Sequence, residues 1–141
     1  MSEKMPLLNF HHIGLACKDI EKEIECHKIL GYEIETPIFI DPFQKVKGIF
    51  LTNNNFRIEI LAPLSNGSPL ISYLTRGIKM YHQCYSCKDI DKTIRYLEGQ
   101  GAKLLSPPVS AVAFNNRKIA FLILKTKMLI ELVEGEGILL K

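Results

Sequence analysis

Two histidines and two glutamates of this sequence have the types and the spacing of a metal-binding set. His12 and His82 lie 82 − 12 = 70 residues apart, and Glu59 and Glu131 lie 131 − 59 = 72 residues apart. Each glutamate stands among apolar neighbours in a β-like run, where a carboxylate is costly to bury unless it is paired or binds a metal. Two neutral imidazoles and two carboxylates would balance a divalent ion and leave positions open for water or substrate. The alternative is that the histidines bond to the backbone and the carboxylates face water.

The near-equal separations belong to an internal repeat of the chain. When the sequence is shifted by 70 residues, eight of the positions 12–31 are identical to their counterparts in 82–101. About one identity is expected from average residue usage. We therefore predict that residues 1–141 form a single domain of two related modules. Module 1 covers about 9–64, a linking helix about 68–77, and module 2 about 78–135.

Each module is predicted to contain a strand, a helix and then three strands. The first strands cover residues 10–17 and 80–87, and the helices follow the N-cap residues Asp19 and Asp89. Gly31 and Gly101 are suitable helix stops. The later β-like runs cover about 32–36, 45–52 and 56–62 in module 1, and about 102–105, 117–124 and 127–133 in module 2. The loop over residues 107–113 shows no regular pattern.

Composition and charge exclude several classes of protein. Hydrophobic residues make up 47% and charged residues 23% of the chain, which is ordinary for a globular domain. The net charge of +3 and the absence of a basic, aromatic-rich patch give no support for nucleic-acid binding. No signal-peptide pattern and no apolar run of about 20 residues is present, so we expect a cytoplasmic protein with no membrane contact. The four cysteines are predicted to be reduced thiols, because Cys84 and Cys87 would point to opposite faces of a strand.

Four short stretches give the chain a resemblance to a known family. They are His11-His12-Ile13-Gly14-Leu15-Ala16, Ile58-Glu59-Ile60-Leu61-Ala62-Pro63-Leu64, Asn116-Arg117-Lys118-Ile119-Ala120-Phe121-Leu122 and Leu129-Ile130-Glu131-Leu132-Val133-Glu134. In this order and spacing, over about residues 9–135, they resemble the vicinal oxygen chelate superfamily. Its glyoxalase I and methylmalonyl-CoA epimerase branches are the most similar.

The resemblance implies an α+β fold, in which two tandem βαβββ modules form a curved mixed sheet around a metal-containing cup. It implies that His12, Glu59, His82 and Glu131 are the metal ligands. In the epimerases a carboxylate on the third strand also transfers a proton, but the corresponding position here is Gly48. Two-base epimerisation would therefore lack its usual second base, and the epimerase alternative predicts that Gly48→Glu raises epimerisation sharply by restoring that base.

We therefore expect a metal-dependent lyase or isomerase of the glyoxalase I (lactoylglutathione lyase) type. It would move a proton α to a carbonyl of a thiol adduct or acyl-thioester through a metal-stabilised enediolate. Glu59 or Glu131 would be the catalytic base. One alternative is methylmalonyl-CoA epimerase. An alternative of another class is a non-catalytic protein of the same fold that binds or sequesters a small molecule.

The remaining expectations concern substrate, metal and assembly. Gln44, Asn116 and Arg117 are the weaker candidates for substrate binding, and for Gln44 the alternative is a solvated edge-strand residue. The cofactor is expected to be one divalent ion, Ni²⁺, Co²⁺, Mn²⁺ or Zn²⁺, among which the donor set does not choose. The resemblance favours a homodimer.

Overall fold

The computed structural model describes residues 4–135 of the chain. The two ends of the predicted single domain, residues 1–3 and 136–141, lie outside the described residues. The chain divides into two compact units, each of which is described by itself. The N-terminal unit is His12–Tyr81, and the C-terminal unit consists of residues 4–11 and 82–135.

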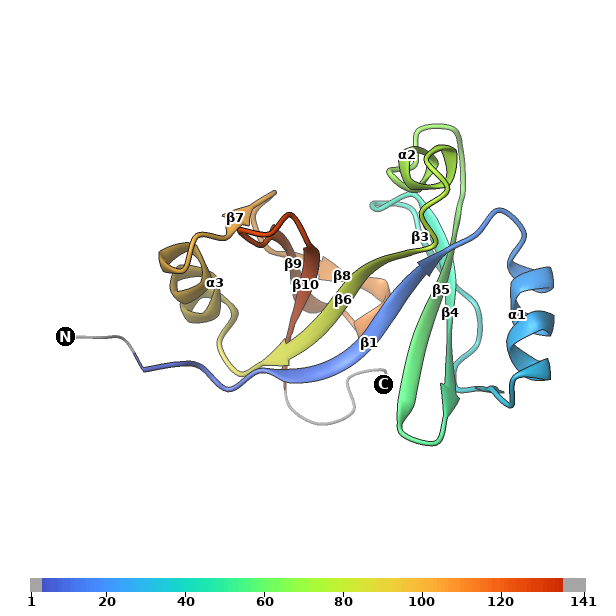
Figure 1. Cartoon of the computed structure of the whole chain (residues 1–141), viewed down its shortest axis with the longest axis horizontal. Coiled ribbons are helices and arrows are strands. Elements are labelled where there is room, and N and C mark those ends of the chain that lie inside the picture. The colour runs from blue at the N-terminus through green and yellow to red at the C-terminus, as the bar shows by residue number, and fades with distance from the viewer. Residues whose placement is uncertain (1–3, 136–141) are drawn as a thin grey trace. The chain divides into compact units, whose positions relative to one another are not determined.

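The N-terminal unit carries a mixed sheet, with one helix between its first two strands and a shorter helix after its last strand (Figure 1). Its elements are β1 (Asn9–Ala16, of which residues 12–16 belong to this unit), α1 (Ile20–Ile29), β2 (Glu33–Ile34), β3 (Phe39–Asp41), β4 (Val46–Asn53), β5 (Phe56–Pro63) and α2 (Leu70–Thr75). β1 is parallel to β5, and β5 is antiparallel to β4. β2 and β3 are short edge strands that both pair with β4.

Helix α1 begins and ends where the sequence predicts. The side chain of Asp19 accepts a hydrogen bond from the Lys22 amide at 3.1 Å, which satisfies one of the free N–H groups of the first turn. After the helix, Gly31 adopts a φ of +94°, a left-handed conformation that favours glycine. The same cap and stop recur at Asp89 and Gly101 in the C-terminal unit.

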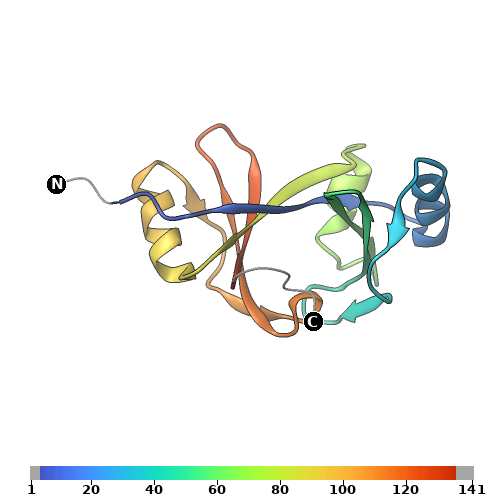
Figure 2. The same cartoon turned by 90° about the horizontal axis from the view of Figure 1, so that it is seen from below.

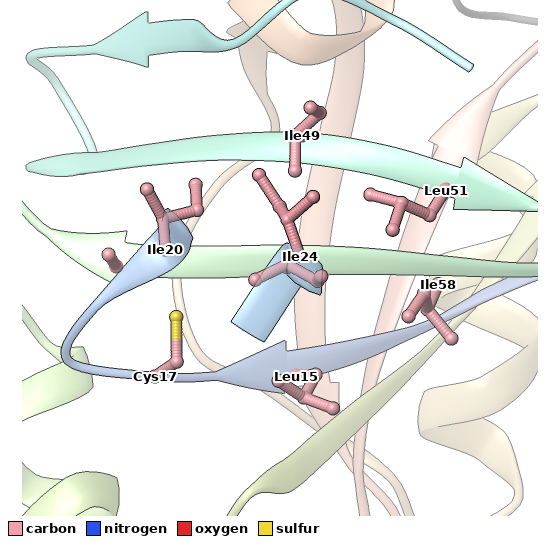
Figure 3. Packing of buried hydrophobic residues seen from close by; sticks show 9 residues of the cluster. Leu15, Cys17, Ile20, Ile24, Ile49, Leu51 and Ile58 are labelled. Carbon is pink, nitrogen blue, oxygen red and sulfur yellow. The ribbon is translucent and has the colours of Figure 1, made fainter. Parts of the chain in front are cut away.

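The core of the N-terminal unit lies between α1 and one face of the sheet. Apolar side chains from β1, β4 and β5 point toward the helix and meet its buried residues Ile20 and Ile24 (Figure 3). The cluster also contains Cys17, which directly follows β1, and the strand residues Leu15, Ile49, Leu51, Ile58, Ile60 and Ala62. Because side chains alternate along a strand, Glu59, between Ile58 and Ile60, lies on the opposite face, and so does His12, three positions before Leu15.

The C-terminal unit has the same order of elements. They are β6 (Met80–Cys87, of which residues 82–87 belong to this unit), α3 (Ile90–Gly99), β7 (Lys103–Leu104), β8 (Val109–Ala111), the 3₁₀ turn η1 (Val112–Phe114), β9 (Arg117–Ile123) and β10 (Leu129–Glu134). β10 is parallel to β6 and antiparallel to β9, with which it forms the orange-to-red hairpin of Figure 2. β7 and β8 both pair with β9.

The C-terminal core lies between α3 and the sheet. Ile90 and Ile94 of the helix pack against Leu122, Ile130 and Leu132 of the hairpin. Glu131 lies between two of these core residues in the sequence, so its side chain projects from the opposite face. In both units one sheet face therefore packs on a helix while the other carries the candidate ligands.

The structure corrects the predicted elements at two places. β3 and β8, three residues each, replace segments in which no strand was predicted, and β8 with η1 gives regular structure to the loop over residues 107–113. The linking helix is α2, which lies inside the predicted range. Within residues 4–135, no helix has the length and the apolar character needed to span a membrane.

Candidate metal centre and active site

The N-terminal unit brings His12 and Glu59 together on neighbouring strands. Glu59 on β5 is the register partner of Gly14 on β1, which is two residues from His12 and on its face of the sheet. The Nε2 atom of His12 lies 3.0 Å from Oε1 of Glu59. His12 is fully buried and Glu59 is only 4% exposed, so this imidazole and this carboxylate contact each other in the protein interior.

The C-terminal unit builds the same pair from β6 and β10. Glu131 is the register partner of Cys84, two residues after His82, just as Glu59 is the partner of the residue two after His12. His82 Nε2 lies 3.2 Å from Glu131 Oε1, and both residues are buried. The sequence repeat is therefore also a repeat of geometry. The alternative that these carboxylates face water is wrong for both units.

An aromatic ring supports each histidine, and the sequence analysis did not single out either ring. Phe50 of β4 is the register partner of Glu59, and its ring meets the His12 ring edge-on at 5.2 Å and 76°. Phe121 of β9 is the partner of Glu131, and its ring meets His82 at 5.6 Å and 89°. These edge-to-face contacts restrict the orientation of each imidazole. An alignment of Ile49-Phe50-Leu51 with Ala120-Phe121-Leu122 identifies Phe50 and Phe121 as matching positions of the repeat.

The donor chemistry of each pair fits a divalent metal. A neutral imidazole nitrogen and a carboxylate oxygen are donors that Ni²⁺, Co²⁺, Mn²⁺ and Zn²⁺ accept. A buried carboxylate needs a compensating positive charge or hydrogen bonds, and a metal ion would supply that charge. Each unit thus offers half of the four-residue donor set that the sequence predicts.

The weaker candidates lie in turns and at a strand start. Gln44 is held in a local turn, where its amide N–H and its side-chain Nε2 donate to the carboxylate of Asp41 at 3.0 and 2.7 Å. Asn116 is exposed in a turn with a φ of +66°. Arg117 begins β9 and is half-buried. By strand alternation Arg117 shares a face with Phe121. Of the three weaker candidates, Arg117 is therefore the one on the face that carries the proposed ligands.

Within residues 4–135 no disulfide joins any of the four cysteines, and none of them belongs to a His–Glu pair. Burial raises the pKa of Cys17 and of Cys87 from 9.0 to about 11, with nearby carboxylates contributing in the same direction. These two thiols are therefore poor nucleophiles near neutral pH.

Two units with the same order of a strand, a helix and further strands, each carrying a matched His–Glu pair, are typical of one class of α+β metal-binding protein. The family model described as the Glyoxalase/Bleomycin resistance protein/Dioxygenase superfamily matches residues 11–121. The chain belongs to this superfamily, which confirms the predicted family and fold class.

Relatives of the chain include acyl-CoA epimerases. The ethylmalonyl-CoA/methylmalonyl-CoA epimerase of Cereibacter sphaeroides is 30% identical over 115 residues, covering 79% of this chain and 85% of that protein. The crystal structure of methylmalonyl-CoA epimerase from Mycobacterium tuberculosis is similar with a TM-score of 0.80 and 26% identity, over 97% of this chain and 93% of that one. A methylmalonyl-CoA epimerase in complex with methylmalonyl-CoA and NH4+ has a TM-score of 0.79 at 22% identity, over 96% and 99% of the two chains.

These relatives change the balance between the predicted functions. They support the epimerase alternative, an isomerase activity, better than the preferred glyoxalase I activity. None of these relatives specifically supports glyoxalase I or lyase chemistry.

Proposed function

We propose that the protein is a metal-dependent isomerase that epimerises the α carbon of a 2-carboxyacyl-CoA thioester. The observation that carries this proposal is the buried His–Glu pair that recurs, in the same strand register, in both units. The epimerase relatives supply the substrate class. Cytoplasmic location and a homodimer stay predictions.

We assign one divalent ion to His12, Glu59, His82 and Glu131, one pair from each unit. Two imidazoles and two carboxylates give a neutral set with M²⁺, which suits residues as buried as these. When bound, the ion would supply a Lewis acid that polarises the thioester carbonyl and so acidifies the α proton. The metal could be Ni²⁺, Co²⁺, Mn²⁺ or Zn²⁺.

Epimerisation requires proton transfer on both faces of the α carbon, and we assign the two transfers to Glu59 and Glu131. One glutamate takes the α proton as the C–H bond breaks and its electron pair moves toward the carbonyl oxygen. The other glutamate, which carries a proton when the substrate binds, donates that proton to the opposite face, so the two residues have exchanged protonation states when the product leaves. Gly48, which the resemblance places at the usual third-strand base, has no group that transfers protons. The matched carboxylates of the two units are the candidates with the required chemistry.

Deuterium exchange from each pure epimer tests this assignment. Methylmalonyl-CoA of each configuration, and a hemithioacetal, would be incubated in D₂O with metal-loaded wild type, Glu59→Gln, Glu131→Gln and the exposed control Glu33→Gln. We expect wild type to invert and exchange both epimers. In each site variant the rate of inversion should fall by at least the ~10²-fold expected for loss of a general base. Each variant should still exchange the α proton of one epimer, the one whose proton the remaining glutamate takes.

The contrary outcomes are equally definite. If both site variants invert methylmalonyl-CoA as fast as Glu33→Gln, the glutamates are not the bases. If only the hemithioacetal reacts, the glyoxalase I activity replaces the epimerase. If nothing exchanges, the protein is not this kind of enzyme. Metal content measured on the same samples separates loss of a base from loss of the ion.

A further inference from the structure

The ligand-bearing face of the N-terminal unit continues from His12 into an aromatic wall. The Phe50 ring, edge-on to His12, lies 6.0 Å from the Phe39 ring at an interplanar angle of 30°. Phe39 belongs to the edge strand β3 and is half-buried, whereas Phe50 is fully buried. Phe39 is therefore the member of this wall that a ligand can reach.

The Phe39 ring packs directly against Gly48. A Cβ atom at this position would lie 2.5 Å from Cζ of Phe39, 2.6 Å from Cδ2 of Leu61 and 3.0 Å from the Ile60 carbonyl oxygen. Carbon atoms in normal contact are about 3.5–4.0 Å apart, so no side chain fits at position 48 unless its neighbours move. The Phe39 ring takes the volume that such a side chain would need. The expectation that Gly48→Glu alone restores a base does not fit this geometry.

The ligand-bearing face is apolar on one side of Glu59 along β5 and charged on the other. On one side lies Leu61, the register partner of Gly48, within an apolar cluster that Phe39 joins. On the other side lies Arg57, whose Nε and Nη2 donate to the two carboxylate oxygens of Glu35 at 2.7 and 3.0 Å. By strand alternation Arg57, Glu59 and Leu61 share one face. An α carbon held at Glu59 thus meets apolar surface in one direction and charge in the other.

We propose that Phe39 is a specificity-determining residue that limits the size of the alkyl substituent on the substrate's α carbon. This inference rests on the proposed function, because the α proton must come within hydrogen-bond reach of Glu59. The alkyl group then lies toward Leu61 and Phe39, and the charged groups lie toward Arg57. The substrate class is a 2-carboxyacyl thioester with a short substituent.

The expected effect follows from the volume that the ring occupies. Burial of one additional methylene changes binding by about fourfold, and one methylene in an apolar pocket typically changes specificity by about 10- to 200-fold. Truncating the benzyl side chain of Phe39 to the methyl group of alanine opens room for several methylenes. We therefore expect Phe39→Ala to raise the ratio of kcat/KM for a butyl against a methyl substituent by at least ~10-fold.

The experiment compares α-proton exchange in D₂O for methyl-, ethyl- and n-butylmalonyl-CoA. The enzymes are wild type, Phe39→Ala, the conservative Phe39→Leu and the control Ile40→Ala. Ile40 is the next residue of β3, 50% exposed, and projects from the opposite face. The butyl-to-methyl ratio should rise most in Phe39→Ala, less in Phe39→Leu, and not in Ile40→Ala.

Each outcome bears on a separate claim. If wild type exchanges methylmalonyl-CoA but the ratio is unchanged in both Phe39 variants, the specificity role is refuted and the proposed function stands. The same holds if Ile40→Ala raises the ratio equally. If wild type exchanges none of the three thioesters, the proposed function itself fails. Should Phe39→Ala not fold, as seen from its thermal unfolding, Phe39→Leu decides the question alone.

Discussion

Gly48→Ala places a single methyl group where the structure has no room. The added Cβ would approach Phe39 and Leu61 about 1 Å closer than carbon atoms normally do. Overpacking of this kind costs about 1–3 kcal/mol. Alanine also lowers the conformational entropy of the unfolded chain, which stabilises the folded state by about 0.4–1 kcal/mol. We expect a net loss of about 1–2 kcal/mol in the free energy of unfolding, or roughly 3–8 °C in Tm for a chain of this size.

The cause of this loss is tested by repeating Gly48→Ala in a Phe39→Ala background. Removing the ring relieves the closest contact but leaves Leu61 and the Ile60 carbonyl, so the cost should shrink by about 1 kcal/mol. Gly99→Ala is the matched control, since a Cβ there meets nothing within 4 Å. Urea unfolding measures the change in unfolding free energy for Gly48→Ala in wild type, for Gly48→Ala in the Phe39→Ala background, and for Gly99→Ala. A cost of Gly48→Ala that is zero, or equal in both backgrounds, would refute the contact between position 48 and Phe39.

Two further predictions concern stability. Because the pKa of Cys17 and of Cys87 rises from 9.0 to about 11 on folding, the unfolded chain loses these protons first. The free energy of unfolding should therefore fall as pH rises from 9 to 11, by roughly 2 kcal/mol per thiol. Urea melts across this range should show the fall, and a Cys17→Ala/Cys87→Ala variant should lose it; an equal slope would exclude the thiols as its cause. Asp89→Ala removes the cap of α3 and should cost about 1 kcal/mol in the same assay, against no change for an exposed Lys88→Ala.

The candidate ligands were predictable because a repeat leaves two independent copies of the same signal. His12 and Glu59 are individually ordinary strand residues, and only their match to His82 and Glu131 distinguishes them. The sequence left their burial open, because a strand carboxylate with apolar neighbours can also face water, and the structure shows that all four side chains are buried. The helices were predictable for a local reason, since caps and stops are formed by residues close in sequence.

The aromatic wall was not predictable, because it depends on a strand too short to be recognised. β3 has three residues, so it shows no alternation, and it forms only by pairing with β4. Without that register nothing in the sequence places Phe39 over Gly48. In the sequence, Gly48 indicates only that a base is missing. In the structure, the side chains of Phe39 and Leu61 occupy the space that a side chain at position 48 would need.

Metal stoichiometry is the measurement that decides the proposal that His12, Glu59, His82 and Glu131 bind one divalent ion. Elemental analysis of purified wild type, His12→Ala and His82→Ala after incubation with Ni²⁺ or Co²⁺ would measure ions bound per chain. We predict one ion per wild-type chain and near-complete loss in both variants, since each removes a ligand of the same site. Two ions per chain, or a His82→Ala variant that retains its metal, would contradict the shared site.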